Sequence, residues 1–339
     1  MRAVVAAEIN PNEPLAALSV TDMPEPAARQ EWASIRTQAV TVNHHDLWSL
    51  QGVGLQASRL PMILGTDVCG VVETALDGRP DLPVGSEVVA YTVVGLNGQP
   101  GDASVGTEQG VASGERRSIL SEYYAGTMAE YTSVPVANLF AKPQHLTAAQ
   151  AAALGTSWLT AYSMLFTAAG VKPGDSVLIQ GAGGGVSTAA VQMAHAAGLE
   201  VFVCSRSEAK RSRVVQLGAD WAGEPGERLP HKVDAVLDSV GSTTWAHSVR
   251  SVRPGGTIAV CGATTGDMPG AELTRIFFQD LRVQGVTMGS RADFARMLRF
   301  VEHQRLVPVI AQTWTVNQAR QAFVAVMEGT QFGKAAIAF

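Results

Sequence analysis

The residues best suited to bind a phosphate group form a glycine-rich run in the second half of the chain. An apolar stretch, residues 177–180, precedes the run, which reads Gly181, Ala182, Gly183, Gly184, Gly185, Val186 and Ser187. Glycines let backbone N–H groups approach a pyrophosphate, and the helix expected from Val186 onward adds partial positive charge. With a second strand about 20 residues further on, the pattern predicts a dinucleotide site. A turn without a ligand is the alternative, and Ser187 departs from the usual third glycine.

The polar residues after that second strand favour NADPH over NADH. Enzymes that use NAD place Asp or Glu there, to accept a hydrogen bond from the ribose 2′-hydroxyl. Here Ser205 and Arg206 follow the strand, and Lys210 lies one helical turn further. A guanidinium group can bind a 2′-phosphate with two hydrogen bonds. A solvated basic start of a helix is the alternative, and the nearby carboxylate of Glu208 complicates the assignment.

Two more short segments follow predicted strands of the same sheet. One contains Asp238 and Val240, and the other contains Gly262 and Ala263. Ligands bind at the carboxyl ends of parallel strands. We therefore expect these segments to line the ribose and the nicotinamide, with ordinary turn chemistry as the alternative.

The elements that must position these residues alternate between strands and helices. Short β-branched runs predict strands at residues 176–180, 200–204, 233–238 and 257–262. Helical patterns separate them at residues 186–197, 208–217 and 243–252. This succession is typical of a doubly wound parallel sheet, and so of an α/β fold.

The rest of the chain has a different character. Residues 1 to about 145 predict short strands between turn signals, for example at 33–42, 68–73 and 84–92, and a long surface loop at 95–114. Amphipathic helices are predicted at 292–303 and 317–327, followed by a final strand at 334–339. Residues 147–171 carry no charge, but polar residues and Gly155 interrupt them. We interpret this segment as two buried helical pieces, with a membrane helix as the alternative.

The bulk properties fit a cytoplasmic protein of about two domains that acts on small molecules. The 339 residues are 46% hydrophobic. The net charge of −5 gives no electrostatic attraction to nucleic acid or to an anionic membrane. The three cysteines are widely spaced in apolar runs, so buried thiols are expected rather than disulfides or metal ligands. The apolar run at the N-terminus is too short for a signal peptide.

Segments along essentially the whole chain resemble the medium-chain dehydrogenase/reductase superfamily, in particular its zinc-free quinone oxidoreductase-like branch. They are residues 42–48, 60–72, 126–131, 159–162, the glycine-rich run and residues 253–256. The resemblance implies a GroES-like β-barrel catalytic domain, formed by residues 1–150 and 290–339. It also implies a Rossmann domain at 151–289, a cleft between the two, and a homodimer built through edge strands near residues 283–288.

The resemblance also bears on metal binding. Zinc alcohol dehydrogenases hold their catalytic metal with a Cys, a Gly-His-Glu motif and a second Cys. The matching positions here are Asn43, Thr66 with Asp67, and Thr156, and an amide and hydroxyls are poor zinc ligands. Residues 95–122 match the lobe that holds four cysteines in those relatives, and they contain none. We predict no metal, and adjacent histidines such as His44 and His45 on a strand or tight turn would point apart.

A site without a Lewis acid suits some hydride transfers better than others. Oxidation of a simple alcohol is harder without zinc, because zinc lowers the pKa of the alcohol and stabilises the alkoxide. Hydride addition to a C=C bond conjugated to a carbonyl places the negative charge on an enolate oxygen, which a few hydrogen bonds can stabilise. The sequence therefore predicts NADPH-dependent reduction of a quinone, an enone or an enoyl thioester. An alcohol dehydrogenase of a biosynthetic pathway and a non-catalytic NADPH-binding protein are the alternatives.

The resemblance assigns candidate catalytic and substrate-binding roles. Asn43 would donate to the substrate carbonyl, or else stabilise a turn. His45 would deliver a proton, or else be a structural histidine. Asp67 would orient Asn43 or His45, or satisfy backbone donors. Trp48 and Tyr124 would border the substrate, with plain core packing as the alternative for Trp48.

Further residues are matched to cofactor contacts in the family. His44 corresponds to a pyrophosphate contact, and Thr160 to a residue that packs against the nicotinamide. Thr156, four residues before Thr160, is included as a cofactor contact. The segments containing Met288, Gly289 and Lys334 match those that close over the nicotinamide ring in the family. An exposed, solvated charge is the alternative for Lys334.

Overall fold

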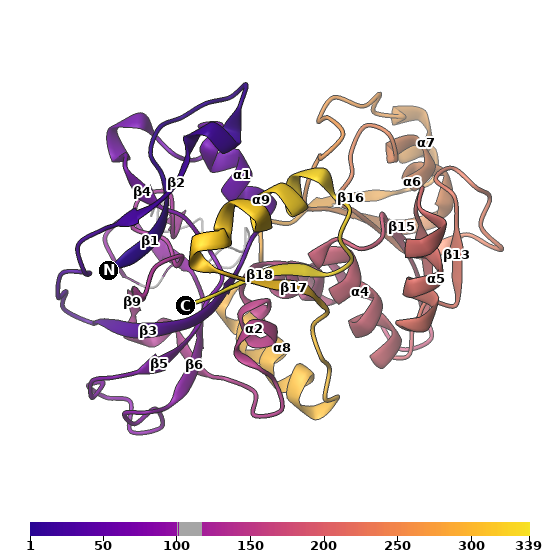
Figure 1. The fold of residues 1–339 in the computed structure, drawn as a ribbon. Coiled ribbons are helices and arrows are strands. Elements are labelled where there is room, and N and C mark those ends of the chain that lie inside the picture. The colour runs from indigo at the N-terminus through magenta and orange to yellow at the C-terminus, as the bar shows by residue number, and fades with distance from the viewer. Residues whose placement is uncertain (100, 102–116) are drawn as a thin grey trace. The chain divides into compact units, whose positions relative to one another are not determined.

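The computed structural model describes residues 1–99, 101 and 117–339, and the chain folds into two compact units (Figure 1). Unit 1 contains Met1–Thr156 and Ser290–Phe339, and unit 2 contains Ser157–Gly289. The first boundary lies after Thr156 rather than after residue 150. Most of the surface loop predicted at 95–114 lies outside the described residues.

Unit 2 is built on a six-stranded sheet in the order β13-β12-β11-β14-β15-β16, in which every neighbouring pair is parallel. The strands are β11 (Ser176–Gln180), β12 (Glu200–Cys204), β13 (Trp221–Gly223), β14 (Val233–Asp238), β15 (Val252–Val260) and β16 (Arg282–Gly285). The connecting helices are α4 (Gly185–Ala196), α5 (Glu208–Gln216), α6 (Trp245–Ser251) and α7 (Leu273–Phe278). The predicted doubly wound sheet is confirmed.

The strand predictions for unit 2 succeed because buried parallel strands are nearly continuous apolar runs. β11, β12 and β14 have the predicted bounds. β15 starts earlier than predicted, at Val252, because Pro254 and the glycines after it cannot continue the preceding helix. No strong sequence pattern marks β13 or β16, which are the short edge strands of the sheet.

The uncharged segment at 147–171 is helical almost throughout. It forms α2 (Ala148–Ala152), a π-helical turn (Leu154–Trp158), α3 (Leu159–Tyr162) and a second π-helical turn (Ser163–Ala168). The break predicted around Gly155 is thus a widened helical turn rather than a gap. In the part of the chain that the structure describes, no helix has the length and apolar character that crossing a bilayer requires.

Unit 1 is rich in strands. Its largest sheet has the order β10-β6-β5-β3-β18-β17, with β9 also paired to β3. These strands are β3 (Trp32–Thr41), β5 (Cys69–Val72), β6 (Glu87–Ala90), β9 (Tyr131–Pro135), β10 (Leu139–Ala141), β17 (Ile310–Thr315) and β18 (Lys334–Ala338). Smaller sheets contain β1 (Arg2–Ala6), β2 (Leu18–Asp22) and β4 (Met62–Ile63), and β7 (Val93–Gly95) with β8 (Arg117–Ile119).

The pairing of β3 with β18 brings the two ends of the chain together. Ala336 lies opposite Thr41 in this antiparallel pair, so the start of β18 meets the residues that follow β3. The helix α9 (Ala319–Glu328), yellow in Figure 1, packs on β17 and β18. The other helices of unit 1 are α1 (His44–Leu50), α2, α8 (Arg291–His303) and short 3₁₀ turns.

The adjacent residues His44, His45 and Asp46 lie in the first turn of α1, not on the strand or tight turn that we expected. The helix begins here because the Asp46 carboxylate accepts a hydrogen bond from the Asn43 backbone N–H at 2.7 Å. Asp46 also accepts from the Gly65 N–H at 3.0 Å, which ties the loop before Thr66 to the helix.

Candidate active site

A buried polar cluster in unit 1 joins the end of β3 to the start of β18. The Asn43 Nδ2 donates to Asp67 Oδ2 at 2.8 Å and to Thr66 Oγ1 at 3.2 Å. Thr66 Oγ1 lies 2.9 Å from Thr156 Oγ1, and Lys334 Nζ donates to Asn43 Oδ1 at 2.5 Å. The three positions matched to zinc ligands therefore do lie together, and both N–H groups of the Asn43 amide are already engaged within the cluster.

Lys334 is the residue whose surroundings differ most from expectation. It is only 4% exposed, so the alternative of a solvated charge is wrong. Its Nζ also donates to Val42 O at 2.8 Å and forms an ion pair with Asp67 at 3.4 Å. Burial lowers the pKa of Lys334, while the charges of Asp67 and Asp46 act in the opposite direction.

Asp67 is fully buried and binds Asn43, one of the two residues that we expected it to orient. Its Oδ2 also accepts from the Thr41 hydroxyl, while its Oδ1 has no hydrogen-bond partner among the described residues. Gly155 lies against that oxygen, because a Cβ at this position would come within 2.7 Å of it. The glycine therefore leaves the room that the buried carboxylate needs.

His45 forms an ion pair with a residue that was not predicted from the sequence. Its Nε2 lies 3.1 Å from Glu122 Oε1, and neither side chain is more than 23% exposed. Burial alone would lower the pKa of His45, but the hydrogen bond to Glu122 and the charges of Asp46, Glu122 and Asp67 outweigh it and raise that pKa. The same pair lowers the pKa of Glu122 against the effect of its burial. No sequence spacing signals this pair, since the residues are 77 positions apart.

The aromatic candidates have other partners. The Tyr124 hydroxyl donates to Leu96 O at 3.0 Å, and its ring packs against Trp32 and lies under the Arg29 guanidinium. Trp48 is half-buried on α1, with its ring centroid 6.3 Å from that of His44, which is exposed. The structure does not show these rings contacting the Asn43 cluster within the described residues.

The cluster does not have the chemistry of a zinc site. An amide and two hydroxyls occupy the matched positions, and a buried ammonium group lies against the amide oxygen. Thiolates and imidazoles are what zinc prefers. Across residues 1–99, 101 and 117–339, no three His, Cys, Asp or Glu side chains come close enough to hold a metal ion.

In unit 2, the glycine-rich run forms a turn that only glycine adopts easily. Gly181 and Gly183 both have φ of 87°, and Gly184 is the N-cap of the 12-residue helix α4. Ser187, which departs from the usual pattern, is buried and donates to Gly184 O at 3.1 Å. The serine thus fits where a third glycine was expected. Backbone N–H groups and a helix N-terminus are in place for a pyrophosphate.

Positive charge gathers where β12 leads into α5. Ser207 caps α5 by accepting from the Lys210 N–H, and the Ser205 hydroxyl accepts from the Ser207 N–H, both at 3.3 Å. Burial lowers the pKa of Lys210, and the like charges of Arg206 and Arg213 lower it further. An anion bound here would relieve that repulsion.

The other predicted cofactor residues of unit 2 mostly shape tight turns. Asp238 is fully buried and accepts from the Thr244 and Ser248 hydroxyls and from the Val240 and Gly241 N–H groups. These bonds are the turn chemistry that we kept as the alternative for this segment. Gly262 lies close to the Ser239 carbonyl oxygen, because a Cβ there would come within 3.2 Å of it. Thr160 is buried, and Met288, next to Gly289, has a φ of 55°. The last predicted residue is Ala263, which follows Gly262.

Known proteins resemble the chain over its full length. Residues 29–144 match the family model described as an alcohol dehydrogenase GroES-like domain, and residues 185–303 match the one described as a zinc-binding dehydrogenase. An acryloyl-coenzyme A reductase of Sulfurisphaera tokodaii is 26% identical over 92% of this chain and 94% of its own. A crotonyl-CoA reductase of Streptomyces avermitilis is 27% identical over 96% of this chain and 82% of its own.

A solved structure adds to this likeness. The crystal structure of an NAD-dependent alcohol dehydrogenase is 32% identical, with a TM-score of 0.89 over 100% of both chains. The predicted combination of a GroES-like domain and a Rossmann-type parallel sheet is thereby confirmed. The chain belongs to the medium-chain dehydrogenase/reductase superfamily of oxidoreductases.

Proposed function

We propose that this chain is an NADPH-dependent reductase that transfers hydride to a quinone, an enone or an enoyl thioester without a metal ion. The observation that carries the proposal is the buried amino group of Lys334, which lies against Asn43 and Asp67 at the positions matched to zinc ligands. The nearby charges of Asp67 and Asp46 favour its ammonium form. A buried cation disfavours a second cation nearby and supplies positive charge of its own. The acryloyl- and crotonyl-CoA reductases, whose names denote enoyl thioesters, support the substrate class.

Unit 2 binds the cofactor. The turn at Gly181 and Gly183 and the N-terminus of α4 hold the pyrophosphate, and Ser205, Arg206 and Lys210 hold the 2′-phosphate. When bound, NADPH supplies the hydride. The clustered cations and the absence of an acidic residue at the end of β12 support NADPH over NADH.

A chain of hydrogen bonds polarises the substrate carbonyl. It starts at the Lys334 ammonium and runs through the Asn43 amide to the Thr66 hydroxyl, which is then free to donate to Thr156. Hydrogen bonds in such a chain strengthen one another in a buried environment. Both N–H groups of Asn43 are engaged, and the half-exposed Thr156 hydroxyl donates to Thr66 O at 3.2 Å. We assign the donor to Thr156, whose hydroxyl would turn from Thr66 O to the substrate carbonyl.

His45 completes the reaction as the general acid. Hydride addition at the β-carbon of an enone leaves an enolate, and the imidazolium proton passes to its α-carbon. For a quinone, the same proton goes to an oxygen. The ring is left neutral and is protonated again before the next turnover.

A substrate screen tests this function. Chelator-treated enzyme is mixed with NADPH and crotonyl-CoA, cyclohexenone or menadione, and loss of NADPH absorbance is followed. We expect turnover with at least one of them and no gain on adding zinc. Alcohol oxidation that requires added zinc would favour an alcohol dehydrogenase, which the NAD-dependent relative makes the second candidate. Tight NADPH binding without turnover of any probe would indicate a binding protein.

The cofactor assignment predicts the effect of removing one guanidinium group. Arg206→Ala is expected to weaken NADPH binding by about 1.5–3 kcal/mol, because a charge-assisted contact to the 2′-phosphate is lost. NADH binding should change little. Fluorescence titrations with both cofactors measure this, and equal losses for NADPH and NADH would contradict the assignment.

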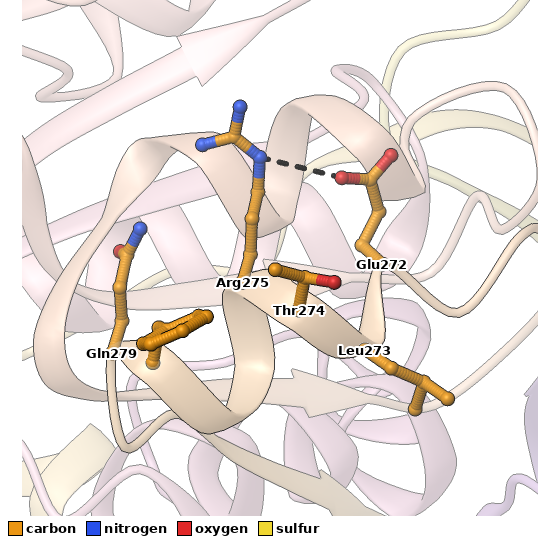
Figure 2. Close-up of a pocket in the computed structure, with 6 residues that line it drawn as sticks. Glu272, Leu273, Thr274, Arg275 and Gln279 are labelled. Atoms are coloured by element: carbon orange, nitrogen blue, oxygen red, sulfur yellow. Dashed lines mark ion pairs between the residues drawn. The ribbon is translucent and has the colours of Figure 1, made fainter.

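We also propose a homodimer built through the edge of the unit 2 sheet. β16 has β15 as its one strand partner in the described sheet, and all four of its residues are exposed. Large apolar side chains are exposed nearby in sequence: Leu273, Phe277, Phe278 and Val283. Figure 2 shows Leu273 at the start of α7, with its side chain extending away from the Glu272–Arg275 ion pair. Sedimentation equilibrium that returns the 35.6 kDa mass of a single chain would contradict the dimer.

A further inference from the structure

Glu122 is held in place from two sides, unlike an ordinary surface carboxylate. Its Oε1 lies 3.1 Å from His45 Nε2. Its Oε2 accepts from the Ser118 hydroxyl at 3.2 Å and from the Ile119 N–H at 3.3 Å. The carboxylate therefore connects the turn after β8 to the first turn of α1, with both of its oxygens engaged.

Gly54 leaves the space that this carboxylate occupies. A Cβ on Gly54 would come within 2.6 Å of Glu122 Oε1, and its φ of 79° also disfavours other residues. A side chain at this position would displace the oxygen that binds His45. The loop after α1 is thus shaped around the ion pair.

The two nitrogens of the His45 ring have different surroundings. Nε2 is bound to Glu122, while Nδ1 is buried and has no hydrogen-bond partner among the described residues. A buried polar atom without a partner is uncommon and calls for an explanation. A substrate group that accepts a proton would provide the missing partner.

We propose that Glu122 is a positioning residue that holds His45 through Nε2, so that Nδ1 is the atom that delivers the proton. The Nδ1–H bond breaks as a C–H or O–H bond forms on the reduced substrate, and the neutral ring keeps its other proton on Nε2, facing Glu122. This inference rests on the proposed function, which makes His45 the general acid. It adds the partner that sets the ring's orientation and charge.

The charged groups around the ring determine how much Glu122 contributes. Asp46 on α1, Asp67 before β5 and Glu122 after β8 all favour the imidazolium, whereas burial disfavours it. The charge of Lys334 on β18 lowers the pKa of the neighbouring His44. Glu122 is the only one of the three carboxylates hydrogen-bonded to the ring in the part of the chain that the structure describes.

An NMR titration of His45 tests the inference without any substrate. Glu122→Gln retains an amide of the same shape but removes the charge. We expect the pKa of His45 in this variant to be lower by about 1 or more, since an opposite charge within hydrogen-bonding distance has been lost. Glu73→Gln is the matched control, because Glu73 also pairs with a cation, Arg36, in unit 1. An unchanged pKa of His45 in Glu122→Gln would overturn the inference.

The pH dependence of turnover separates this inference from the proposed function. The acid form of His45 is needed, so turnover falls as pH rises through its pKa. In Glu122→Gln that fall should move to lower pH. At a pH above both pKa values, turnover of the variant should be about tenfold lower if its His45 pKa is lower by about 1. NADPH affinity should not change.

Two outcomes distinguish the two proposals. If His45→Gln removes the pH-dependent fall but Glu122→Gln leaves it in place, His45 is the acid and Glu122 does not position it. If His45→Gln leaves turnover and its pH profile intact, His45 is not the general acid and the inference about Glu122 falls with it, while the reductase function stands. Absence of NADPH turnover in the unmodified enzyme with every probe is what would overturn that function.

Discussion

Replacing His45 with glutamine is expected to lower turnover by about 10²–10⁴-fold, the usual contribution of a general acid. Glutamine still offers Glu122 an N–H donor, but it has no proton to give at neutral pH. NADPH affinity should stay the same, because most of the predicted contacts to the phosphates lie in unit 2 and His44, the predicted contact in unit 1, is left in place. Steady-state assays with the best of the three probe substrates, together with NADPH titrations, separate the two effects.

His231 provides a matched control for this prediction. Its Nε2 also pairs with a glutamate, Glu200, at 2.8 Å, and its pKa is also raised, but it is 49% exposed in unit 2. His231→Gln should leave turnover unchanged. The raised pKa of His45 means that the acid form persists above the ordinary value near 6.5 and is lost as pH rises further. A His45→Gln enzyme with wild-type turnover would exclude the imidazole from proton transfer.

The features that could be predicted from sequence are those encoded within one short segment. The strand before Gly181, the glycines and α4 are contiguous, so their spacing alone predicts the phosphate-binding turn. Asn43, Thr66 and Thr156 were matched to one site through family resemblance, and they form one hydrogen-bonded cluster. Local pattern and resemblance together were enough to predict the scaffold.

The missing features depend on contacts between distant parts of the chain. Lys334 is 291 positions from Asn43, and its sequence context, a glycine followed by small residues, does not distinguish a buried lysine from a solvated one. Only the β3–β18 pairing decides this. Glu122 similarly follows a loop whose path no local pattern specifies. The helix at His44 was missed because this segment was expected to be a strand or tight turn, and Asp46 was not recognised as the residue that caps it.

Lys334→Met is expected to destabilise unit 1 by about 3–5 kcal/mol, the range for removing one partner of a buried ion pair. Methionine fills the space of the lysine stem, but Asp67 is fully buried and would keep a charge without its counterion. The Asn43 carbonyl would also lose its donor. Urea unfolding followed by fluorescence measures the loss, and turnover should fall too, since the hydrogen-bond chain to Thr156 loses its cation.

Lys142→Met is the matched control for stability. Lys142 is as buried as Lys334, with 6% of its side chain exposed, but its partner Glu87 is 45% exposed and can be solvated when the lysine is removed. The loss there should therefore be much smaller. Adding Asp67→Asn to Lys334→Met should restore part of the stability, because the unpaired charge is gone, but should not restore turnover. If Lys334→Met costs no more than Lys142→Met and turns over normally, the buried ammonium neither stabilises the cluster nor takes the place of a metal ion.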